Sequence, residues 1–472
     1  RAPRAAPGAA RGARESGPPS AGAPPANGSR GPKHQASMRN APRIYNLFPR
    51  LLGPMDRWVE WCRHAASLLF DWVYINPFHY PGFSGSLYAI KDYQKLNPLF
   101  LPEARPAGED DLGSLRAFVG AARDTGVRLM MDLVINHTAK DSELVRARPD
   151  WFLRDPDGGV KSPSAIDPAD ARRVTVWGDL GEVDNHGSSD RENLWRFWER
   201  LVEDYARLGF EGFRCDAAYQ VPAALWSRVI AAARRVNPDC LFFAETLGCR
   251  LEDIVALQGA GFDCIASSSK WWNFSDAWCL EQHSQFRSLA PSVSFPETHD
   301  TARLAAETGG LAPVQVQRYA FAAMFSAGIL MPIGYEYGFR RKLDVVRTSP
   351  ADMEEPSFDI RPAVREINVL KQTFPILSSE GLVEALWGLD GPVLCLRKSW
   401  GDERLLAVIN KDWREPRHVA IGAIAALLGG GPVAQIWPRG GRVEGLWERT
   451  LGPAEVVMFR AGSAPVSAPA AD

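Results

Sequence analysis

Several acidic side chains of this chain stand where short apolar segments end. They are Asp132, Asp216, Glu245 and Asp300. A single carboxylate at such a place is as easily a helix cap or the partner of an arginine. Here an arginine and two histidines accompany the set in the chain: Arg214, His137 and His299. Side chains of these types at the ends of separate strands indicate one shared site for acid–base chemistry.

Neighbouring carboxyl groups with unequal pKa values suit the cleavage of a glycosidic bond. One protonates the leaving oxygen, and the other attacks the sugar or activates water. Asp216 lies two residues after Arg214, so both side chains point the same way in a strand, and the guanidinium favours an ionised Asp216. Glu245 follows the apolar run LFFA, where burial raises the pKa of a carboxyl group, as a general acid requires.

Eight short apolar segments alternate along the chain with amphipathic helical patterns, and the acidic residues lie at or just after the ends of some of these segments. The eight segments are Arg43–Phe48, Trp72–Asn76, Arg128–Val134, Gly212–Asp216, Cys240–Glu245, Phe262–Ala266, Ser292–Phe295 and Ile329–Ile333. The clearest helical patterns are Met55–Phe70, Leu112–Thr125, Glu192–Leu208 and Pro222–Val236. This alternation predicts an α/β protein with a (β/α)8 TIM barrel over residues 39–375. Residues 136–191 lack periodicity, which predicts a long excursion after the third strand.

A different pattern follows the barrel. Separate strand-like segments predict a small antiparallel β domain over residues 376–461, with one helical stretch at Ile421–Leu428. The expected strands are Leu382–Trp387, Val393–Ser399, Leu405–Asn410, Pro432–Trp437 and Val456–Arg460. Segments 1–38 and 462–472 are low in complexity and are expected to be disordered. The first residue is not Met, so either the chain is part of a longer one or translation begins at Met38, and both readings stay open.

The composition of the chain argues against several classes of binding partner. The net charge is −2, which gives no global attraction to nucleic acid or to an anionic membrane. No apolar run reaches the length of a membrane span. The seven cysteines are scattered and contain no Cys-x-x-Cys pair, so we expect neither a disulfide framework nor a zinc site, and a reducing, cytoplasmic location.

Four segments in order resemble the short motifs of the α-amylase superfamily, glycoside hydrolase family 13. They are MDLVINHT (131–138), GFRCDAA (212–218), FFAET (242–246) and FPETHD (295–300). Residues 85–100 resemble the family's tyrosine loop, and the resemblance extends from about residue 43 to residue 460. It implies a retaining enzyme that acts on an α-glucan or maltooligosaccharide through a covalent glycosyl-aspartate, without a cofactor.

The resemblance also implies roles for single residues. Asp216 resembles the nucleophile, Glu245 the acid/base, and Asp300 the carboxylate that holds the sugar hydroxyls. Retention implies carboxyl groups of Asp216 and Glu245 roughly 5–5.5 Å apart. The remaining matches are with substrate-binding positions: Tyr88 as a stacking platform, His137 and His299 as hydrogen-bond donors, and Arg214 as the partner of Asp216.

Other positions keep two readings. Asp132 is expected to be structural, paired with Arg214. Asn136 matches a calcium-binding position of many relatives, although calcium needs several more oxygen ligands, from Asp179 or Asp184, and an ordinary hydrogen-bonding role is the alternative. Trp271–Trp272 could line outer sugar sites or pack in the core.

Departures from the family pattern leave the reaction open between hydrolysis and transfer. Tyr219 and Gln220 occupy places where many amylases carry Lys-His. Residues 76–93 resemble bacterial enzymes of glycogen and maltose metabolism, including maltosyltransferases that use maltose-1-phosphate. A catalytically silent glucan-binding barrel is the non-enzyme alternative. A metal-dependent barrel hydrolase would need a His-x-His motif after the first strand, and RIYNLF offers none. The sequence does not indicate the oligomeric state.

Overall fold

The computed structural model of the chain describes residues 41–104, 110–167 and 170–462. The predicted disordered segment 1–38 and, apart from Gly462, the predicted tail 462–472 lie outside the described residues. The barrel and the C-terminal sheet fall within one compact unit, Asn40–Asp472. The domain boundary near residue 375 stays a prediction.

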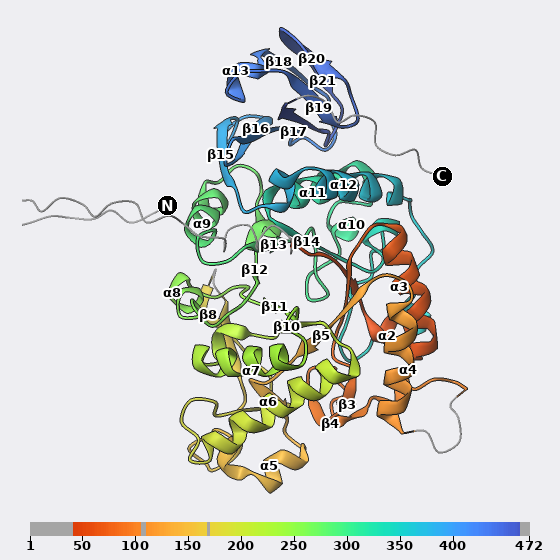
Figure 1. Ribbon diagram of the computed structural model, residues 1–472, viewed down its shortest axis with the longest axis vertical. Helices are drawn as coiled ribbons and strands as arrows, with labels where there is room; N and C mark the ends of the chain where they lie inside the picture. Colours follow the sequence, from red (N-terminus) through yellow and green to blue (C-terminus); the bar gives the residue numbers. More distant parts are fainter. Residues whose placement is uncertain (1–40, 105–109, 168–169, 463–472) are drawn as a thin grey trace, which may run out of the picture. The chain divides into compact units, whose positions relative to one another are not determined.

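Within the described residues, eight parallel strands close into a barrel (Figure 1). In the order of their pairing they are β1 (Arg43–Leu47), β14 (Gly328–Pro332), β13 (Ser292–Ser294), β12 (Cys264–Ala266), β11 (Leu241–Ala244), β10 (Gly212–Cys215), β5 (Arg128–Leu133) and β2 (Trp72–Ile75). Seven of these strands fall within a predicted segment, and β14 begins one residue before its predicted start at Ile329, so the predicted TIM barrel is confirmed. Parallel strands bring all their carboxyl ends to one face, where the loops can share a site.

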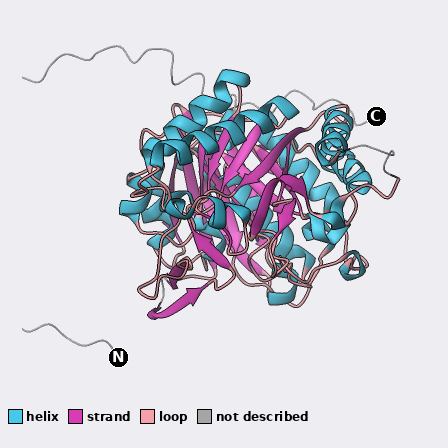
Figure 2. Cartoon of the chain, turned by 90° about the horizontal axis from the view of Figure 1, so that it is seen from below, coloured by secondary structure: helices cyan, strands magenta, loops and turns pink. Residues whose placement is uncertain are grey.

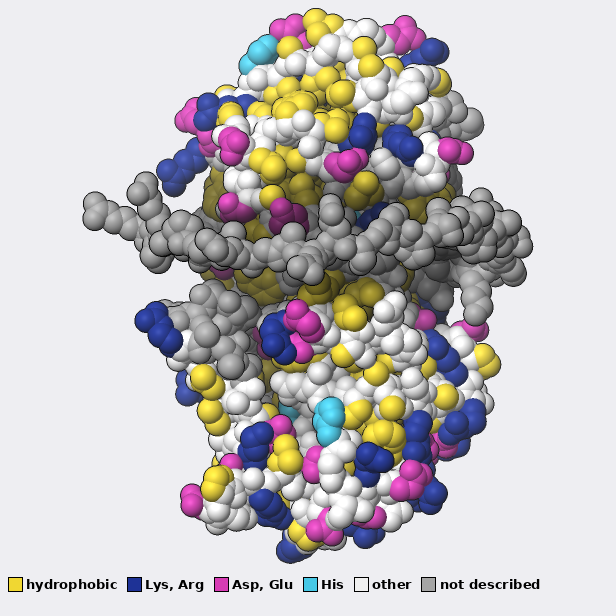
Figure 3. Space-filling view, turned by 90° about the vertical axis from the view of Figure 1, so that its left-hand side faces the viewer, with side chains coloured by type: hydrophobic (Ala, Val, Ile, Leu, Met, Phe, Trp, Pro, Cys, Tyr) yellow, Lys and Arg dark blue, Asp and Glu magenta, His cyan; other side chains and the backbone are white. Residues whose placement is uncertain are grey.

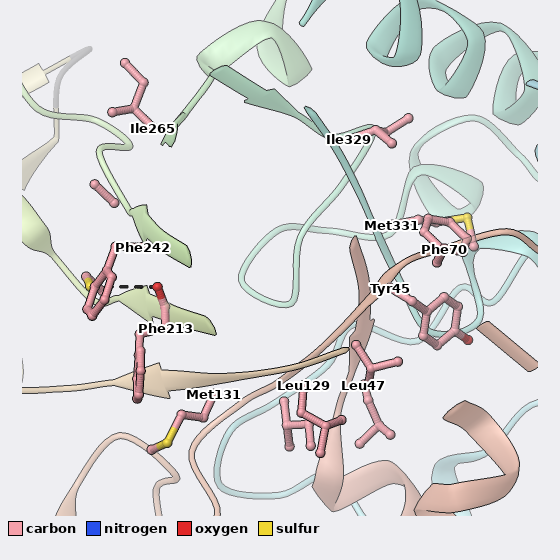
Figure 4. Packing of buried hydrophobic residues seen from close by; sticks show 14 of the residues in the cluster. Tyr45, Leu47, Phe70, Leu129, Met131, Phe213, Phe242, Ile265, Ile329 and Met331 are labelled. Carbon is pink, nitrogen blue, oxygen red and sulfur yellow. Dashed lines mark hydrogen bonds between the residues drawn. The ribbon is translucent and has the colours of Figure 1, made fainter. Parts of the chain in front are cut away.

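Side chains alternate between the inside and the outside of the barrel wall. Figure 4 shows Tyr45, Met131, Phe213 and Phe242 on the outer side of their strands, where the covering helices bury them. The interior is filled by bulky residues from alternate positions, among them Trp72. A Cβ atom on Gly212 would lie 2.7 Å from the Trp72 ring, so glycine at this position is the residue that leaves room for the indole.

Helices lie around the central strands in the view from below (Figure 2). They are α2 (Pro49–Leu52), α3 (Trp58–Ser67), α4 (Asp111–Arg123), α6 (Arg191–Leu208), α7 (Ala223–Val236), α8 (Leu251–Val255), α9 (Trp278–Phe286), α10 (Leu304–Glu307), α11 (Ala312–Phe325) and α12 (Arg361–Thr373). The helix α6 shows how the pattern works, because it buries a stripe that includes Leu194, Trp198 and Leu201. It ends at Gly209, whose φ of 112° is easy for glycine alone.

The predicted excursion after the third barrel strand is confirmed, but it contains regular structure that its lack of periodicity concealed. Its elements are β6 (His137–Ala139), α5 (Glu143–Ala147), β7 (Ser164–Asp167), β8 (Asp170–Val176) and β9 (Leu180–Glu182). The strands β6 and β9 pair with each other, as do β7 and β8. A further short pair, β3 (His79–Pro81) and β4 (Ile90–Leu96), follows β2. The strands β3, β6 and β9 have only three residues each, which is too short to carry a period-two signal.

The C-terminal region contains an antiparallel sheet, as predicted. Its order is β15 (Leu382–Trp387), β16 (Val393–Trp400), β17 (Glu403–Asn410), β22 (Val456–Ala461), β19 (Val433–Trp437) and β20 (Arg442–Val443). A second pair, β18 (Arg417–Ala423) and β21 (Leu446–Leu451), was not predicted. The predicted helix Ile421–Leu428 is too long: α13 covers only Ile424–Leu427, because Val419 and Ile421 point into a core shared with Trp447 and belong to β18.

Buried polar contacts join this sheet to the barrel helix α11. Lys398 Nζ donates to the carbonyl of Met324 at 2.8 Å, and Gln317 Nε2 donates to the carbonyl of Asn410 at 2.6 Å. Basic and acidic side chains are interspersed on the face drawn in Figure 3. None of the helices in the described chain combines the length and the apolar character of a transmembrane span.

Candidate active site

A cleft of about 350 Å³ opens at the carboxyl end of the barrel, beside the ends of β5, β10 and β11. Residues that the sequence singled out from distant parts of the chain meet there: Tyr88, Asn136, His137, Arg214, Asp216, Glu245 and Asp300. Each of the three predicted catalytic carboxylates therefore reaches the same space. A concave site with a few convergent polar groups is the usual form of a small-molecule site.

Arg214 lies between two carboxylates beneath the cleft. Its Nη1 atom donates to Asp132 Oδ1 at 2.9 Å and to Asp216 Oδ1 at 2.6 Å. Burial disfavours the charge on Arg214, but Asp132 and the neighbouring groups outweigh burial, so the pKa of Arg214 lies well above its usual value. Asp132 is fully buried, whereas 14% of the Asp216 side chain is exposed. The expected pairing of Asp132 with Arg214 is thus present, and Asp216 alone of the two carboxylates lines the cleft.

Two tyrosines complete the hydrogen bonding of Asp132. Tyr74 and Tyr88 donate their hydroxyls to Asp132 Oδ2 at 2.5 and 2.6 Å. Asn76 Nδ2 lies 3.2 Å from the Tyr74 hydroxyl and 3.1 Å from the Tyr88 hydroxyl, and donates to both. Burial raises the pKa of both tyrosines well above the ordinary value, so they remain hydroxyl donors. Tyr88 is therefore fixed by its hydroxyl while its ring borders the cleft.

Glu245 is held by main-chain amides from two loops. The Ala217 amide donates to Oε2 at 2.9 Å, and the Leu247 amide donates to Oε1 at 3.0 Å. Burial raises the pKa of Glu245 to about 7, with Asp216 adding to the shift while Arg214 opposes it. The expected elevation of this pKa by burial is confirmed. A carboxyl group that titrates near neutrality can both give and take a proton.

The turn after Asp216 is unusual in its backbone. Ala217 has φ of 40° and ψ of 49°, a left-handed conformation that costs a residue with a Cβ atom about 1 kcal/mol or more. The same turn points the Ala217 amide at Glu245, and the Ala218 amide donates to the Glu245 carbonyl at 3.1 Å. The strained turn therefore fixes Glu245 relative to the strand that carries Asp216.

Asp300 stands at the mouth of the cleft, with 63% of its side chain exposed. Its Oδ2 atom lies 3.1 Å from His299 Nε2, which also lies 2.7 Å from the Tyr88 hydroxyl. Desolvation raises the pKa of Asp300, but the opposing effects of His299 and then Arg214 are larger together, so the pKa falls to about 2. His299 itself is buried behind Tyr88 and Asp300 and does not line the cleft. It holds its two neighbours, and its predicted direct contact with a sugar is untested.

His137 borders the cleft with both ring nitrogens free of any partner among the described residues. Burial lowers its pKa, which favours the neutral ring with one donor and one acceptor. Buried polar atoms without partners are rare, so their presence at a cleft indicates contacts with a ligand or with water.

Asn136 also borders the cleft and donates through Nδ2 to Gln220 Oε1 at 3.3 Å. Asp179 lines the cleft too, whereas Asp184 accepts from the Gly187 amide. In the part of the chain that the structure describes, no group of three or more His, Cys, Asp or Glu side chains is arranged to hold a metal ion. The calcium hypothesis stays a prediction.

The two residues that depart from the amylase pattern, Tyr219 and Gln220, both line the cleft. They replace two basic side chains with neutral ones close to Glu245. The tandem tryptophans divide between their two readings: Trp272 is buried against Phe274 and Phe321, whereas Trp271 is half exposed.

Sequence reasoning missed Tyr74 and the two amides that hold Glu245. An available signal pointed to Tyr74, because Trp72, Tyr74 and Asn76 alternate along one strand and therefore share its inward face. No signal in the sequence pointed to the amides of Ala217 and Leu247, since every residue except proline carries one.

Comparison with known proteins agrees with this geometry. The family model described as "Glycogen debranching enzyme, glucanotransferase domain" matches residues 38–153. An α-1,4-glucan:maltose-1-phosphate maltosyltransferase of Burkholderia pseudomallei is 27% identical over 411 residues, which cover 83% of this chain and 35% of the relative. A protein of the same name from Myxococcus xanthus is 26% identical over 355 residues, which cover 68% of this chain and 50% of the relative.

In its ordered motifs, in the cleft where they meet and in these relatives, the chain is similar to the α-amylase superfamily, glycoside hydrolase family 13. It spans between a third and a half of the length of these two curated relatives.

Solved structures of family 13 proteins share the fold. An α-amylase from Lactobacillus plantarum superposes with a TM-score of 0.71 at 21% identity, covering 91% of this chain and all of the other. An α-amylase from Geobacillus thermoleovorans, solved with acarbose, gives a TM-score of 0.70 at 15% identity, covering 89% of this chain and 98% of the other. At these identities the superposition supports the barrel and its C-terminal sheet.

Proposed function

We propose that the chain is a retaining α-glucan transglycosylase, with Asp216 as the nucleophile and Glu245 as the acid/base. The observation that carries the proposal is that these two carboxyl groups line one cleft but have different hydrogen-bond partners. Asp216 accepts a hydrogen bond from Arg214 at 2.6 Å, whereas Glu245 accepts from two main-chain amides and burial raises its pKa to about 7. The double-displacement mechanism needs one carboxylate that attacks and a second carboxyl group that gives and takes a proton.

In the first half of this reaction, an Asp216 oxygen forms a bond to the anomeric carbon as the bond to the leaving oxygen breaks. Glu245 gives its proton to that leaving oxygen. In the second half, Glu245 removes a proton from an acceptor hydroxyl, and the acceptor oxygen displaces Asp216. Asp300, which is ionised and exposed at the mouth of the cleft, and His137, which has unpartnered nitrogens, are placed to bind hydroxyl groups of the sugar.

Transfer is favoured over hydrolysis by the relatives. The curated relatives are named as maltosyltransferases that use maltose-1-phosphate, and the matching family model describes a glucanotransferase domain. We therefore propose a maltosyl unit as the transferred group and maltose-1-phosphate as its donor. Hydrolysis of α-glucans is the second candidate, because the same glycosyl-aspartate intermediate can be resolved by water.

We also propose that the protein acts in the cytoplasm. All seven of its cysteines are free thiols, and six of them are buried. Unpaired cysteines in this number are typical of reducing compartments.

The test is an analysis of products by chromatography. The protein is incubated with maltooligosaccharides alone, with maltooligosaccharides and phosphate, and with maltooligosaccharides and maltose-1-phosphate. Acceptors lengthened by two glucose units, with release of phosphate, are the expected result. Redistribution of chain lengths without maltose-1-phosphate would instead indicate disproportionation, and release of glucose or maltose would indicate hydrolysis. Unchanged substrates in all three mixtures would contradict the enzyme assignment and favour a silent glucan-binding barrel.

A further inference from the structure

A second cavity of about 350 Å³ lies beside the barrel and shares no lining residue with the cleft. Its walls come from the loops that follow β12 and β13, from α10 and α11, and from the loop that follows β17. None of its residues belongs to the four family motifs except Phe295 and Pro296, which line this cavity and not the cleft. The proposed reaction gives this cavity no role.

Two exposed tryptophans border the cavity from opposite parts of the chain. Trp271 is 50% exposed and follows a barrel strand, whereas Trp413 is 38% exposed and belongs to the C-terminal sheet region. The neighbouring Trp272 is only 1% exposed and packs in the core, whereas Trp271 remains open to the cavity. Large aromatic side chains left open in a concave site are typical of ligand-binding surfaces.

Charged side chains of both signs lie between the tryptophans. Lys270 is nearly buried, and its Nζ atom lies 3.4 Å from Glu307 Oε2. Arg318 donates through Nη1 to the Trp272 carbonyl at 2.7 Å, while its buried Nε atom has no acceptor among the described residues. The cavity therefore offers both donors and an acceptor. A sugar ring needs this combination, since its hydroxyls donate and accept, whereas a purely anionic ligand would meet Glu307.

The loop that carries Trp413 is held against a barrel loop by Lys411. Lys411 Nζ donates to the Phe274 carbonyl at 3.3 Å and to Ser275 Oγ at 3.1 Å, next to the turn that follows Trp272. It also donates to the carbonyls of Gly388 and Leu389 at 3.0 and 2.8 Å. These contacts of Lys411 hold the loop that carries Trp413 against the barrel loop that follows Trp272. The spacing between Trp271 and Trp413 is therefore preorganised.

We propose that this cavity is a non-catalytic site for an α-glucan chain, in which Trp271 and Trp413 stack on sugar rings while Lys270, Glu307 and Arg318 bind their hydroxyls. The choice of an α-glucan as ligand rests on the proposed function, while the aromatic and charged walls indicate a carbohydrate independently. A site of this kind holds a long acceptor or polymer close to the barrel rim and leaves the chemistry to the cleft.

The experiment measures retention of the full chain in native gels that contain glycogen, with turnover of a short maltooligosaccharide measured in parallel. The variants are Trp271→Ala, Trp413→Ala and, as a matched control, Trp387→Ala. Trp387 is also 38% exposed but borders neither cavity. We expect each cavity variant to weaken glycogen retention about tenfold, which corresponds to about 1.4 kcal/mol. Trp387→Ala should behave like the wild type, and turnover of the short substrate should be unchanged in all three variants.

Other outcomes separate this proposal from the proposed function. Retention unchanged in both cavity variants, or weakened equally in Trp387→Ala, would overturn the second site whatever the activity. A loss of short-substrate turnover as large as the loss of retention would overturn its independence from the cleft. Retention that depends on Trp271 in a protein that turns over no α-glucan would support the second site and contradict the proposed function. A wild-type protein that glycogen does not retain would overturn the second site alone.

Discussion

Two buried arginines of the barrel hold carboxylates in different ways. Arg303 and Glu297 form a closed pair at 2.6 Å, with both side chains 1% exposed. The remaining atoms of this pair are bonded within the protein, to the carbonyl of Ile333 and the amide of Leu304. Arg214 instead shares one nitrogen between Asp132 and Asp216. Arg303 thus has one carboxyl partner, which is sealed inside the protein, whereas Arg214 has two carboxyl partners that differ in their access to the cleft.

A carboxyl group can react only where a substrate can reach it. Asp132 is sealed by two tyrosine hydroxyls, so of the two carboxyl groups only Asp216 is accessible at the cleft. Glu297 belongs to the same short motif as Asp300 but is turned inward. A buried arginine can therefore support a reactive site when it has a second carboxyl partner and when that partner is accessible from the cleft. Variants of the two clusters test this difference.

Asp216→Ala should have the largest effect. It removes the nucleophile and converts the cluster beneath the cleft to the one-to-one stoichiometry of the Arg303 pair. We expect kcat to fall by about 10⁴-fold or more, with the free energy of unfolding unchanged or raised. Steady-state kinetics and urea denaturation measure the two quantities. Turnover comparable to the wild type would contradict the assignment of Asp216.

Glu245→Gln should lower kcat by about 10²–10⁴-fold for donors with a poor leaving group, since the proton donor is lost. In the wild type, kcat should fall as pH rises through about 7, because Glu245 loses its proton there. Raised above the ordinary 4.5, this pKa favours the folded state fully below pH 4.5, and that stabilisation is lost as pH rises through about 7. The variant should therefore unfold at a higher temperature than the wild type at pH 8 but not at pH 4. A pH profile unchanged by the substitution would argue against Glu245 as the acid.

Arg303→Met tests the other side of the comparison. It leaves Glu297 buried without its partner, which should lower the free energy of unfolding by about 3–5 kcal/mol. Because this pair does not reach the cleft, kcat per folded molecule should change far less than in Asp216→Ala. Urea denaturation gives the stability, and active-site titration of the folded fraction gives the corrected kcat. A loss of kcat as large as that of Asp216→Ala, with stability retained, would show that the two pairs are not functionally distinct.

Ala217→Gly should have the smallest effect. Glycine adopts a φ of 40° without the steric cost of a Cβ atom, so folding should be more favourable by up to about 1 kcal/mol. The amide that holds Glu245 is retained, and kcat should remain close to the wild-type value. Thermal unfolding and kcat measured together check this, with Ala218→Gly, which lies in a short helical turn, as the control expected to destabilise. A fall in stability for Ala217→Gly would contradict the view that strain is stored at this turn.

Much of this architecture could be read from residue types and spacing. The barrel strands were predictable because each is a short apolar run whose neighbours carry helical periodicity. The pairing of Arg214 with Asp216 followed from their separation by two residues in a strand. The strands β6, β9, β18 and β21 were not predicted, because pairing partners distant in sequence decide whether segments with a weak pattern become strands.

The chain by itself determined which residue types stand at the ends of the strands and therefore which chemistry is available. Only the tertiary structure decided that Glu297 is sealed while Asp300 is open, that Trp272 is core while Trp271 is surface, and that two main-chain amides hold Glu245. The physical reason is that sequence periodicity records which side of an element is apolar. Access to solvent, and the convergence of groups that every residue carries, arise only when distant loops pack together.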